Sequence, residues 1–332
     1  MSQFSLFSFT VNRLPFTEKS IMIKILIPLY NDWDALDLLL LEIKKSVSVE
    51  LFSKLSFVII DDCSSIPCEI QRFSGYNLSI IRLWRNVSHQ KAIALGLSYL
   101  TQEADFEKVI VMDSDGEDRP SDIQRLYDAS IYESDKIIFA QRAKRSEGLV
   151  FRIGYSIYKL LFGLLTGKVI EFGNFSILPF RQAKKLAYVS EIWNHFPGGI
   201  IRSKLPYSSI PIERGIRLAG KSKMSFVSLI LHGLSAVSVH LDTVAVRILI
   251  GSLWMTVMAG IGAIIVLIIK VLSPENASPG WATTLITASI IIILQALLSS
   301  LFLIFTVLNY RTQKHFIPAK EYSDFIEKVE IS

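Results

Sequence analysis

KVIVMDSDGEDRP, residues 108–120, is a short apolar run that ends in a cluster of acidic residues. If the backbone stays extended, Asp113 and Asp115 place both carboxylates on one face, because side chains alternate along a strand. Carboxylate oxygens suit Mg²⁺ or Mn²⁺, which proteins often bind through one or two carboxylates plus substrate phosphates. The pair therefore predicts a divalent-metal site. The alternative is that both aspartates only cap the next helix; the preceding apolar run and the Gly116 turn favour the metal site.

Similar apolar runs lie on both sides of this segment and alternate with helix-like segments. Runs that are apolar throughout, separated by helices, are typical of a parallel sheet covered on both faces. The sequence therefore predicts an α/β fold with a doubly wound, mostly parallel sheet in a domain over residues 21–223. The expected strands are 21–30, 55–61, 78–84, 108–113 and 136–141, and the expected helices are 34–47, 89–100 and 120–133.

Polar residues follow each of the first four expected strands. In open α/β sheets, ligands bind beyond the carboxyl ends of the strands. Asp32, Asp61 and Asp62 follow the first two strands, where a carboxylate can accept hydrogen bonds from a nucleotide base or ribose. Each of the three can instead cap a helix, and the sequence leaves both interpretations open.

Two long uncharged stretches, residues 248–269 and 281–310, dominate the hydropathy of the C-terminal part. Roughly 20 apolar residues suffice for a helix to cross the hydrocarbon core. The 51% apolar composition agrees with a chain that lies partly in lipid. We therefore expect a two-helix transmembrane anchor over residues 244–310. Residues 224–243 are expected to form an interfacial amphipathic helix, with a plain core helix as the alternative.

Lys and Arg are distributed unevenly around these stretches. The link 273–280 has none, whereas basic residues precede the first stretch and follow the second. The positive-inside rule then predicts a multi-pass protein of the cell (inner) membrane, with the domain over residues 21–223 and both termini cytoplasmic. Residues 311–332 are expected to be a cytoplasmic tail. Residues 1–20 lack the apolar core of a signal peptide and are expected to be a loose extension.

Composition also excludes several classes of protein. The net charge of +5 is mild, and no basic cluster with interleaved aromatics indicates nucleic-acid binding. Cys63 and Cys68, the two cysteines, have neither the spacing of a zinc site nor the number of a disulfide framework. Two spans without broken helices or intramembrane charges disfavour a transporter.

The chain resembles the family 2 glycosyltransferases of the GT-A fold. The closer likeness is to the branch that contains dolichyl-phosphate mannose synthase and the bacterial polyprenyl-phosphate glycosyltransferases. The resemblance covers about residues 30–225, followed by the two-helix anchor of that bacterial branch. It rests on IPLYND (27–32), IIDDCS (59–64), RNVSHQKAIALGL (85–97), MDSDGEDRP (112–120), FRIGYSIYKLLFGLLTG (151–167), GNFSILPFR (173–181) and IERGIRLAGKSKMS (212–225).

The resemblance implies roles for individual residues. The implied metal ligands for Mg²⁺ or Mn²⁺ are Asp113, Asp115 and Glu117. The implied nucleotide-sugar-binding residues are Pro28, Tyr30, Asp32, Asp61, Asp62, Lys91, Asp113, Arg142, Arg217 and Lys223. The candidate catalytic residues are Asp115, Asp118 and Arg152. The sequence departs from the family pattern at Asp32, where Glu is common, at residues 117–120, and at Asn174, where many relatives have Asp.

The expected reaction is a metal-dependent, inverting transfer of a sugar from a nucleotide-sugar to a membrane-associated acceptor. A polyprenyl phosphate is already ionised at neutral pH and needs no protein base. A hydroxyl of a cell-surface glycan precursor would need one, for which Asp118 is the candidate. A further alternative is a non-catalytic nucleotide-sugar-binding membrane subunit. Membrane lipids are expected partners, and a homo-oligomer remains open.

Overall fold

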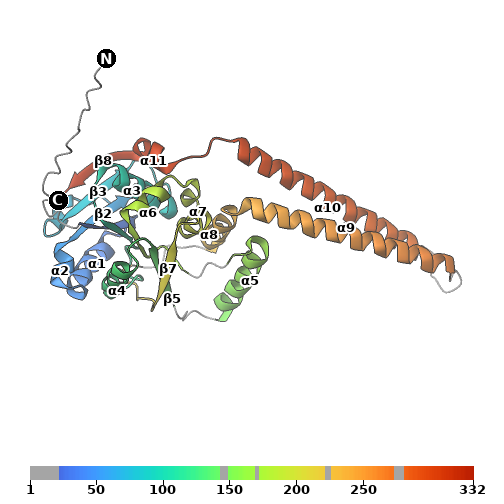
Figure 1. Cartoon of the computed structure of the whole chain (residues 1–332), viewed down its shortest axis with the longest axis horizontal. Helices are drawn as coiled ribbons and strands as arrows, with labels where there is room; N and C mark the ends of the chain where they lie inside the picture. Colours follow the sequence, from blue (N-terminus) through green and yellow to red (C-terminus); the bar gives the residue numbers. More distant parts are fainter. Residues whose placement is uncertain (1–21, 143–148, 169–171, 221–225, 273–279) are drawn as a thin grey trace, which may run out of the picture.

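The computed structural model describes residues 22–142, 149–168, 172–220, 226–272 and 280–332. The expected loose extension, 1–20, lies outside the described residues, as does Lys223. Figure 1 shows an α/β domain from which a long pair of helices projects.

The described residues form one eight-stranded sheet in the order β7-β5-β6-β4-β1-β2-β3-β8. β6 and β8 are antiparallel to their neighbours, and the other pairings are parallel. The mostly parallel sheet is thus confirmed. The strands are β1 (Ile23–Leu29), β2 (Leu55–Asp61), β3 (Leu78–Leu83), β4 (Lys108–Val111), β5 (Ile137–Arg142), β6 (Ser176–Pro179), β7 (Tyr207–Ile212) and β8 (Ile326–Ile331).

The central strands are buried on both faces, which explains why they are apolar throughout. Along β1, Ile25 and Ile27 pack into a core with helices α1 (Trp33–Ser46) and α4 (Ser121–Tyr132), whereas Leu26 packs into a core with α3 (His89–Glu103) on the other face. Gly96 allows α3 to approach closely, because a Cβ there would lie 2.5 Å from Leu26 Cδ1 and 2.6 Å from Ile60 Cγ1. Helices on both faces hold the strand ends in place.

The remaining helices surround this core and lead to the projecting pair. Within the described ranges they are α2 (Val49–Ser53), η1 (Ile70–Phe73), α5 (Leu149–Thr166), α6 (Phe180–Ala187), η2 (Ser190–Trp193), α7 (Phe196–Ser203), α8 (Phe226–Ser238), α9 (Leu241–Leu272), α10 (Trp281–Thr312), α11 (Pro318–Glu321) and η4 (Tyr322–Phe325).

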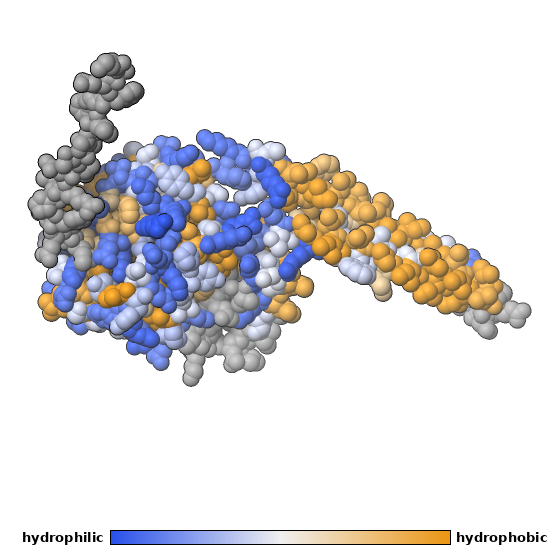
Figure 2. Space-filling model, viewed as in Figure 1, coloured by the Kyte–Doolittle hydropathy of each residue, from blue (hydrophilic) through white to orange (hydrophobic). Residues whose placement is uncertain are grey.

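α9 and α10 are the two helices long and apolar enough to cross a membrane among the described residues. Each has 32 residues, or about 48 Å at 1.5 Å per residue, which exceeds the roughly 30 Å of a hydrocarbon core. Figure 2 shows their surface as an almost continuous hydrophobic rod beside a mostly hydrophilic domain.

α5 and α8 also expose apolar side chains beside the start of α9. Leu160 and Leu164 on α5 and Leu231 and Leu234 on α8 are all exposed. Arg247 of α9 holds α5 close, since its Nη1 donates to the carbonyl oxygens of Gly163 (3.3 Å) and Leu164 (2.6 Å). α8 falls within the expected interfacial segment 224–243.

The expected tail at residues 311–332 instead continues into the sheet. After α11 and η4, β8 pairs antiparallel with β3 in a register that sets Val329 opposite Ile81. The Phe316 and Phe325 rings pack on Trp193, with ring centroids 4.1 and 5.4 Å away. The division of the chain at residue 223 is therefore corrected: the domain also includes its last strand.

Candidate active site

The carboxyl ends of β1, β2, β3, β4, β5 and β7 meet at one edge of the sheet, because β1 to β4 are parallel and the antiparallel β6 joins β4 to β5 and its parallel neighbour β7. Three non-glycine residues with positive φ follow the first three strands: Asn31 (53°), Cys63 (58°) and Ser88 (78°). Such backbone conformations cost of order 1–3 kcal/mol each and cluster at functional sites. This edge is therefore the candidate site.

The loop after β4 is a compact turn and not an extended strand. β4 ends at Val111, Glu117 N–H donates to Asp115 Oδ1 (2.9 Å), and Asp113 N–H donates to Asp118 Oδ2 (3.0 Å). Gly116 has a φ of +82°, and a Cβ there would lie 2.4 Å from Leu218 Cγ. Asp113 and Asp115 are thus brought together by a turn, which corrects the expectation of strand alternation.

Arg217 joins this turn to the loop after β1. Its Nη1 donates to Asp115 Oδ2 (2.8 Å) and its Nη2 donates to Asp32 Oδ2 (2.7 Å). All three side chains are less than one-fifth exposed. One guanidinium therefore pairs with two carboxylates that the sequence assigns to different parts of a donor site.

The segment after β7, residues 213–220, covers the acidic turn. Arg214 donates twice to Glu117 Oε2, from Nε (3.1 Å) and Nη2 (2.6 Å). The N–H groups of Gly215 and Leu218 donate to the carbonyl oxygens of Glu117 (2.8 Å) and Asp115 (2.9 Å). Glu117, an expected metal ligand, therefore uses Oε2 to pair with Arg214.

His89, at the start of α3, contacts the metal-site candidate Asp113. Its Nε2 lies 3.0 Å from Asp113 Oδ1 and 3.1 Å from Asn174 Nδ2. Desolvation alone would lower the pKa of His89, but the Asp113 carboxylate offsets this, and the pKa is raised above its usual value. His89 lies in RNVSHQKAIALGL (85–97), a segment that carries the family resemblance, but a lone histidine does not reveal that the fold places it beside Asp113.

Asp61 and Asp62 are both buried and hold neighbouring loops. Asp62 is 4% exposed and accepts from the N–H groups of Val87 (2.6 Å) and Ser88 (2.9 Å). Burial raises the pKa of Asp62 to about 6, although the two backbone donors work against the shift. Asp61 accepts from the Ser64 N–H (2.8 Å) and from Arg82 Nη1 (2.9 Å).

The remaining expected site residues are placed as follows. Pro28 lies in β1, and Tyr30 follows it with a side chain that is 43% exposed. Lys91 Nζ lies over the Trp193 ring, 5.2 Å from its centroid, and no contact with the strand-end carboxylates is recorded for it among the described residues. Arg142 ends β5 and Arg152 lies in α5, and their side chains are outside the described part.

Asp118, the candidate base, is 3% exposed and its carboxylate accepts the Asp113 N–H. A general base must reach the proton that it removes. The geometry therefore gives Asp118 a role in shaping the turn, and a base role for it has no support here.

Asp113 and Asp115 suit a hard divalent cation. Burial and the neighbouring Asp113 carboxylate raise the pKa of Asp115, although the Glu117 N–H and Arg217 lower it. Such crowding of negative charge is relieved by a cation. No group of three or more His, Cys, Asp or Glu side chains surrounds a possible ion among the described residues. Two carboxylates still match the usual Mg²⁺ pattern, which substrate phosphates complete.

Comparison with known proteins identifies the class. Residues 24–192, just over half of the chain, match the family model for glycosyl transferase family 2. The chain therefore belongs to glycosyl transferase family 2, and it is a glycosyltransferase. A comparison with curated protein sequences finds no match.

Solved structures with a similar fold share little sequence with this chain. Staphylococcus aureus TarS residues 1–349 in complex with UDP is 16% identical, with a TM-score of 0.44. The match covers 69% of this chain and 66% of that chain, so this chain spans just under two thirds of the TarS fragment. Glucosyl-3-phosphoglycerate synthase of Mycobacterium tuberculosis with Mn²⁺, UDP and glucosyl-3-phosphoglycerate is 14% identical (TM-score 0.46; 67% and 80% covered). The mannosyltransferase PcManGT of Pyrobaculum calidifontis with GDP-Man and Mn²⁺ is 13% identical (TM-score 0.42; 84% and 86% covered).

Proposed function

We propose that this chain is a metal-dependent, inverting glycosyltransferase that transfers a sugar from a nucleotide-sugar to polyprenyl phosphate in a membrane. The observation that carries the proposal is the placement of Asp113 and Asp115 at the carboxyl edge of the sheet, with Arg217 shared between Asp115 and Asp32. The two apolar helices α9 and α10, which continue from the same domain, support a membrane-borne acceptor.

The donor nucleotide binds at the ends of β1 and β2. Pro28, Tyr30, Asp32, Asp61 and Asp62 surround the base and ribose in this proposal. Asp32 and Asp115 share one guanidinium, so the nucleoside side and the phosphate side of the site are adjacent.

Arg217 changes partners when the donor binds. A guanidinium is planar and pairs as well with phosphate oxygens as with carboxylates. Without the donor it pairs with both Asp32 and Asp115. With the donor it contacts the diphosphate and releases Asp115. Arg142, Arg152 and Lys223 are further basic candidates for the phosphates.

Asp113 and Asp115 would hold Mg²⁺ or Mn²⁺, which supplies positive charge to the diphosphate leaving group. Glu117, which pairs with Arg214 beside them, would supply the third ligand.

The transfer itself is a single displacement at the anomeric carbon. An oxygen of the acceptor phosphate forms the new bond as the bond from that carbon to the diphosphate breaks, and the electron pair leaves with the nucleotide. No proton is removed, because the acceptor phosphate is ionised at neutral pH. The burial of Asp118 favours this acceptor over a hydroxyl, which needs a base.

The membrane-proximal elements support the choice of a lipid acceptor. Asp242 of α9 accepts from Arg202 of α7 (2.9 Å) and from Arg311 of α10 (3.4 Å), so one carboxylate ties the domain to both long helices. The exposed leucines of α5 and α8 lie beside the start of α9. We place α8 in the membrane interface and the domain on the cytoplasmic side. Tethering raises the effective concentration of an acceptor confined to the same bilayer.

Purified full-length protein, incubated with UDP- and GDP-sugars and polyprenyl phosphate in vesicles, tests the proposal by the mass of the product. Transfer should require Mg²⁺ or Mn²⁺, should stop with a chelator, and should be abolished in Asp115→Asn. Asp128→Asn, on the exposed side of α4, is the matched control. Transfer that continues in chelator or in Asp115→Asn contradicts the proposal. Donor binding without transfer to any acceptor indicates a non-catalytic subunit, and transfer only to a glycan hydroxyl indicates the other acceptor class.

A further inference from the structure

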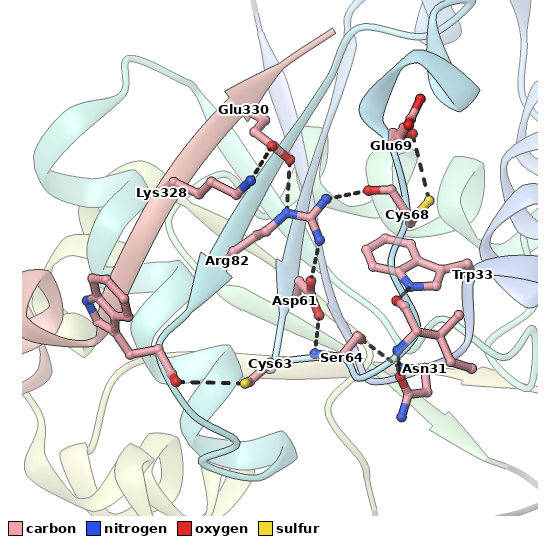
Figure 3. A network of polar contacts seen from close by, with 12 residues as sticks. Asn31, Trp33, Asp61, Cys63, Ser64, Cys68, Glu69, Arg82, Lys328 and Glu330 are labelled. Atoms are coloured by element: carbon pink, nitrogen blue, oxygen red, sulfur yellow. Dashed lines mark hydrogen bonds and ion pairs between the residues drawn. The ribbon is translucent and has the colours of Figure 1, made fainter.

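The C-terminal strand β8 is the outermost strand on one side of the sheet and pairs with β3. Figure 3 shows Glu330 of β8, Arg82 of β3 and Asp61 of β2 in one row across three strands. Asp61 is the register partner of Arg82, and Arg82 is the register partner of Lys328. The last residues of the chain therefore lie two strands away from a candidate donor-binding carboxylate.

All three nitrogen groups of the Arg82 guanidinium are used. Nε donates to Glu330 Oε2 (2.9 Å), Nη1 donates to Asp61 Oδ2 (2.9 Å), and Nη2 donates to the carbonyl oxygen of Cys68. The guanidinium also lies over the Trp33 ring, 5.9 Å from its centroid. Because the Arg82 side chain is only 15% exposed, few other orientations are open to it while these partners remain.

Asp61 in turn positions the loop after β2. Its Oδ1 accepts from the Ser64 N–H (2.8 Å), and Ser64 Oγ accepts from the Asn31 N–H (2.8 Å). Asn31 has positive φ and directly precedes Asp32, the carboxylate held by Arg217. A continuous set of hydrogen bonds thus runs from Glu330 to the two loops that flank the proposed base and ribose site.

We propose that Glu330 is a positioning residue for the donor nucleotide, which acts through Arg82 on Asp61. This inference rests on the proposed function. With β8 in place, Glu330 fixes Arg82, and Arg82 fixes the Asp61 carboxylate and its loop in the geometry that receives the nucleotide. Since β8 follows α10 in the chain, docking of the C-terminal segment and donor affinity are linked.

Binding of UDP and GDP with Mg²⁺ to full-length protein in detergent, measured by calorimetry, tests the inference. Glu330→Ala should raise the Kd of the preferred nucleotide about threefold to tenfold, the range expected for one lost hydrogen bond. Glu327→Ala, at an exposed position of the same strand, is the control and should leave the Kd unchanged. Glu330→Gln keeps the size of the side chain and serves as a second variant in case alanine unfolds the strand. It should shift the Kd in the same direction as Glu330→Ala.

Two further measurements separate positioning from general destabilisation. The donor KM should rise in Glu330→Ala while kcat is unchanged, because a base contact is equally present in the ground state and the transition state. Adding Glu330→Ala to Asp61→Asn should change the Kd little beyond Asp61→Asn alone, because the effect passes through Asp61. The inference is overturned if the wild-type protein binds the nucleotide and every Glu330 variant binds it with the same Kd. It is also overturned if the effects of Glu330→Ala and Asp61→Asn on the Kd are fully additive. Failure of the wild-type chain to bind any nucleotide refutes the proposed function itself.

Discussion

Arg217 Nη1 lies 2.8 Å from Asp115 Oδ2, although 102 positions separate the two residues in the chain. The loop after β7 therefore closes over the acidic turn after β4. The same guanidinium reaches Asp32, so three strand ends share one positive charge. In the proposed mechanism, Arg217 is therefore the residue that changes partners when an anionic donor and a cation bind.

Replacement of Arg217 tests this role. Arg217→Ala should lower kcat/KM for sugar transfer by about 10²- to 10³-fold, the usual loss when one group that stabilises developing charge is removed. Arg217→Lys should recover only part of the loss, because an ammonium cannot pair with two oxygens in the fixed geometry of a guanidinium. Steady-state kinetics checks both variants. Arg181→Ala, an exposed position on α6, is the control, and an equal loss there would contradict a specific role.

Asp118 distinguishes the two acceptor classes. Asp118→Asn keeps an oxygen that can accept the Asp113 N–H but removes any capacity for base catalysis. If the acceptor is a phosphate, transfer by this variant should stay within about tenfold of wild type. A loss of about 10²-fold or more, the usual contribution of a general base, together with a lost limb in the pH–rate profile, would favour a hydroxyl acceptor.

Asp62 makes stability depend on pH. Burial raises its pKa from 3.8 to about 6. Between these two pH values the native state keeps a proton that the unfolded state has lost. Stability from this group is therefore present below pH 4 and is lost as the pH rises through 6, on the order of 2–3 kcal/mol in total.

Asp62→Asn should remove this dependence. The variant loses one acceptor for the Val87 and Ser88 N–H groups, a cost that does not vary with pH. Its free energy of unfolding relative to wild type should therefore improve between pH 4.5 and pH 7.5. Denaturant unfolding at both pH values measures the difference, and a difference that stays constant contradicts the shifted pKa.

Gly96 provides a test of the packing between α3 and the sheet. Gly96→Ala should destabilise the domain by about 1–3 kcal/mol, because the added Cβ would overlap Leu26 and Ile60. Gly75→Ala is the control, since a Cβ there meets nothing within 4 Å. Thermal unfolding measures both, and equal stability of the two variants would show that α3 moves away from the sheet at little cost.

The sequence predicts the first five strands along the chain well and the last three poorly. β1 to β5 each lie within two residues of an expected strand, because buried parallel strands are apolar throughout. β6 has four residues, β7 carries Pro211, and β8 mixes apolar with charged residues and follows the long helices. Local sequence does not show that these short segments pair with strands far away in the chain.

The candidate site also has a part that local sequence predicts and a part that it does not. Asp113 and Asp115 are identifiable because they lie two residues apart in the sequence, at the end of an apolar run. The contacts of Arg217 with Asp32, of His89 with Asp113, and of Glu330 with Arg82 join distant segments. They depend on the register of the sheet and on loop closure, which single-sequence patterns do not fix.

The orientation of α9 and α10 in the membrane yields the last prediction. Basic residues flank the domain side of both helices, and the link 273–280 carries none, so the link should face away from the cytoplasm. In a variant with Cys63→Ser and Cys68→Ser, a cysteine introduced as Asn276→Cys should react with a membrane-impermeant maleimide in intact cells. Ser332→Cys, next to β8, should react only after the membrane is opened. Labelling of Ser332→Cys in intact cells, with Asn276→Cys protected, would invert the topology and remove the active site from the compartment that supplies nucleotide-sugars.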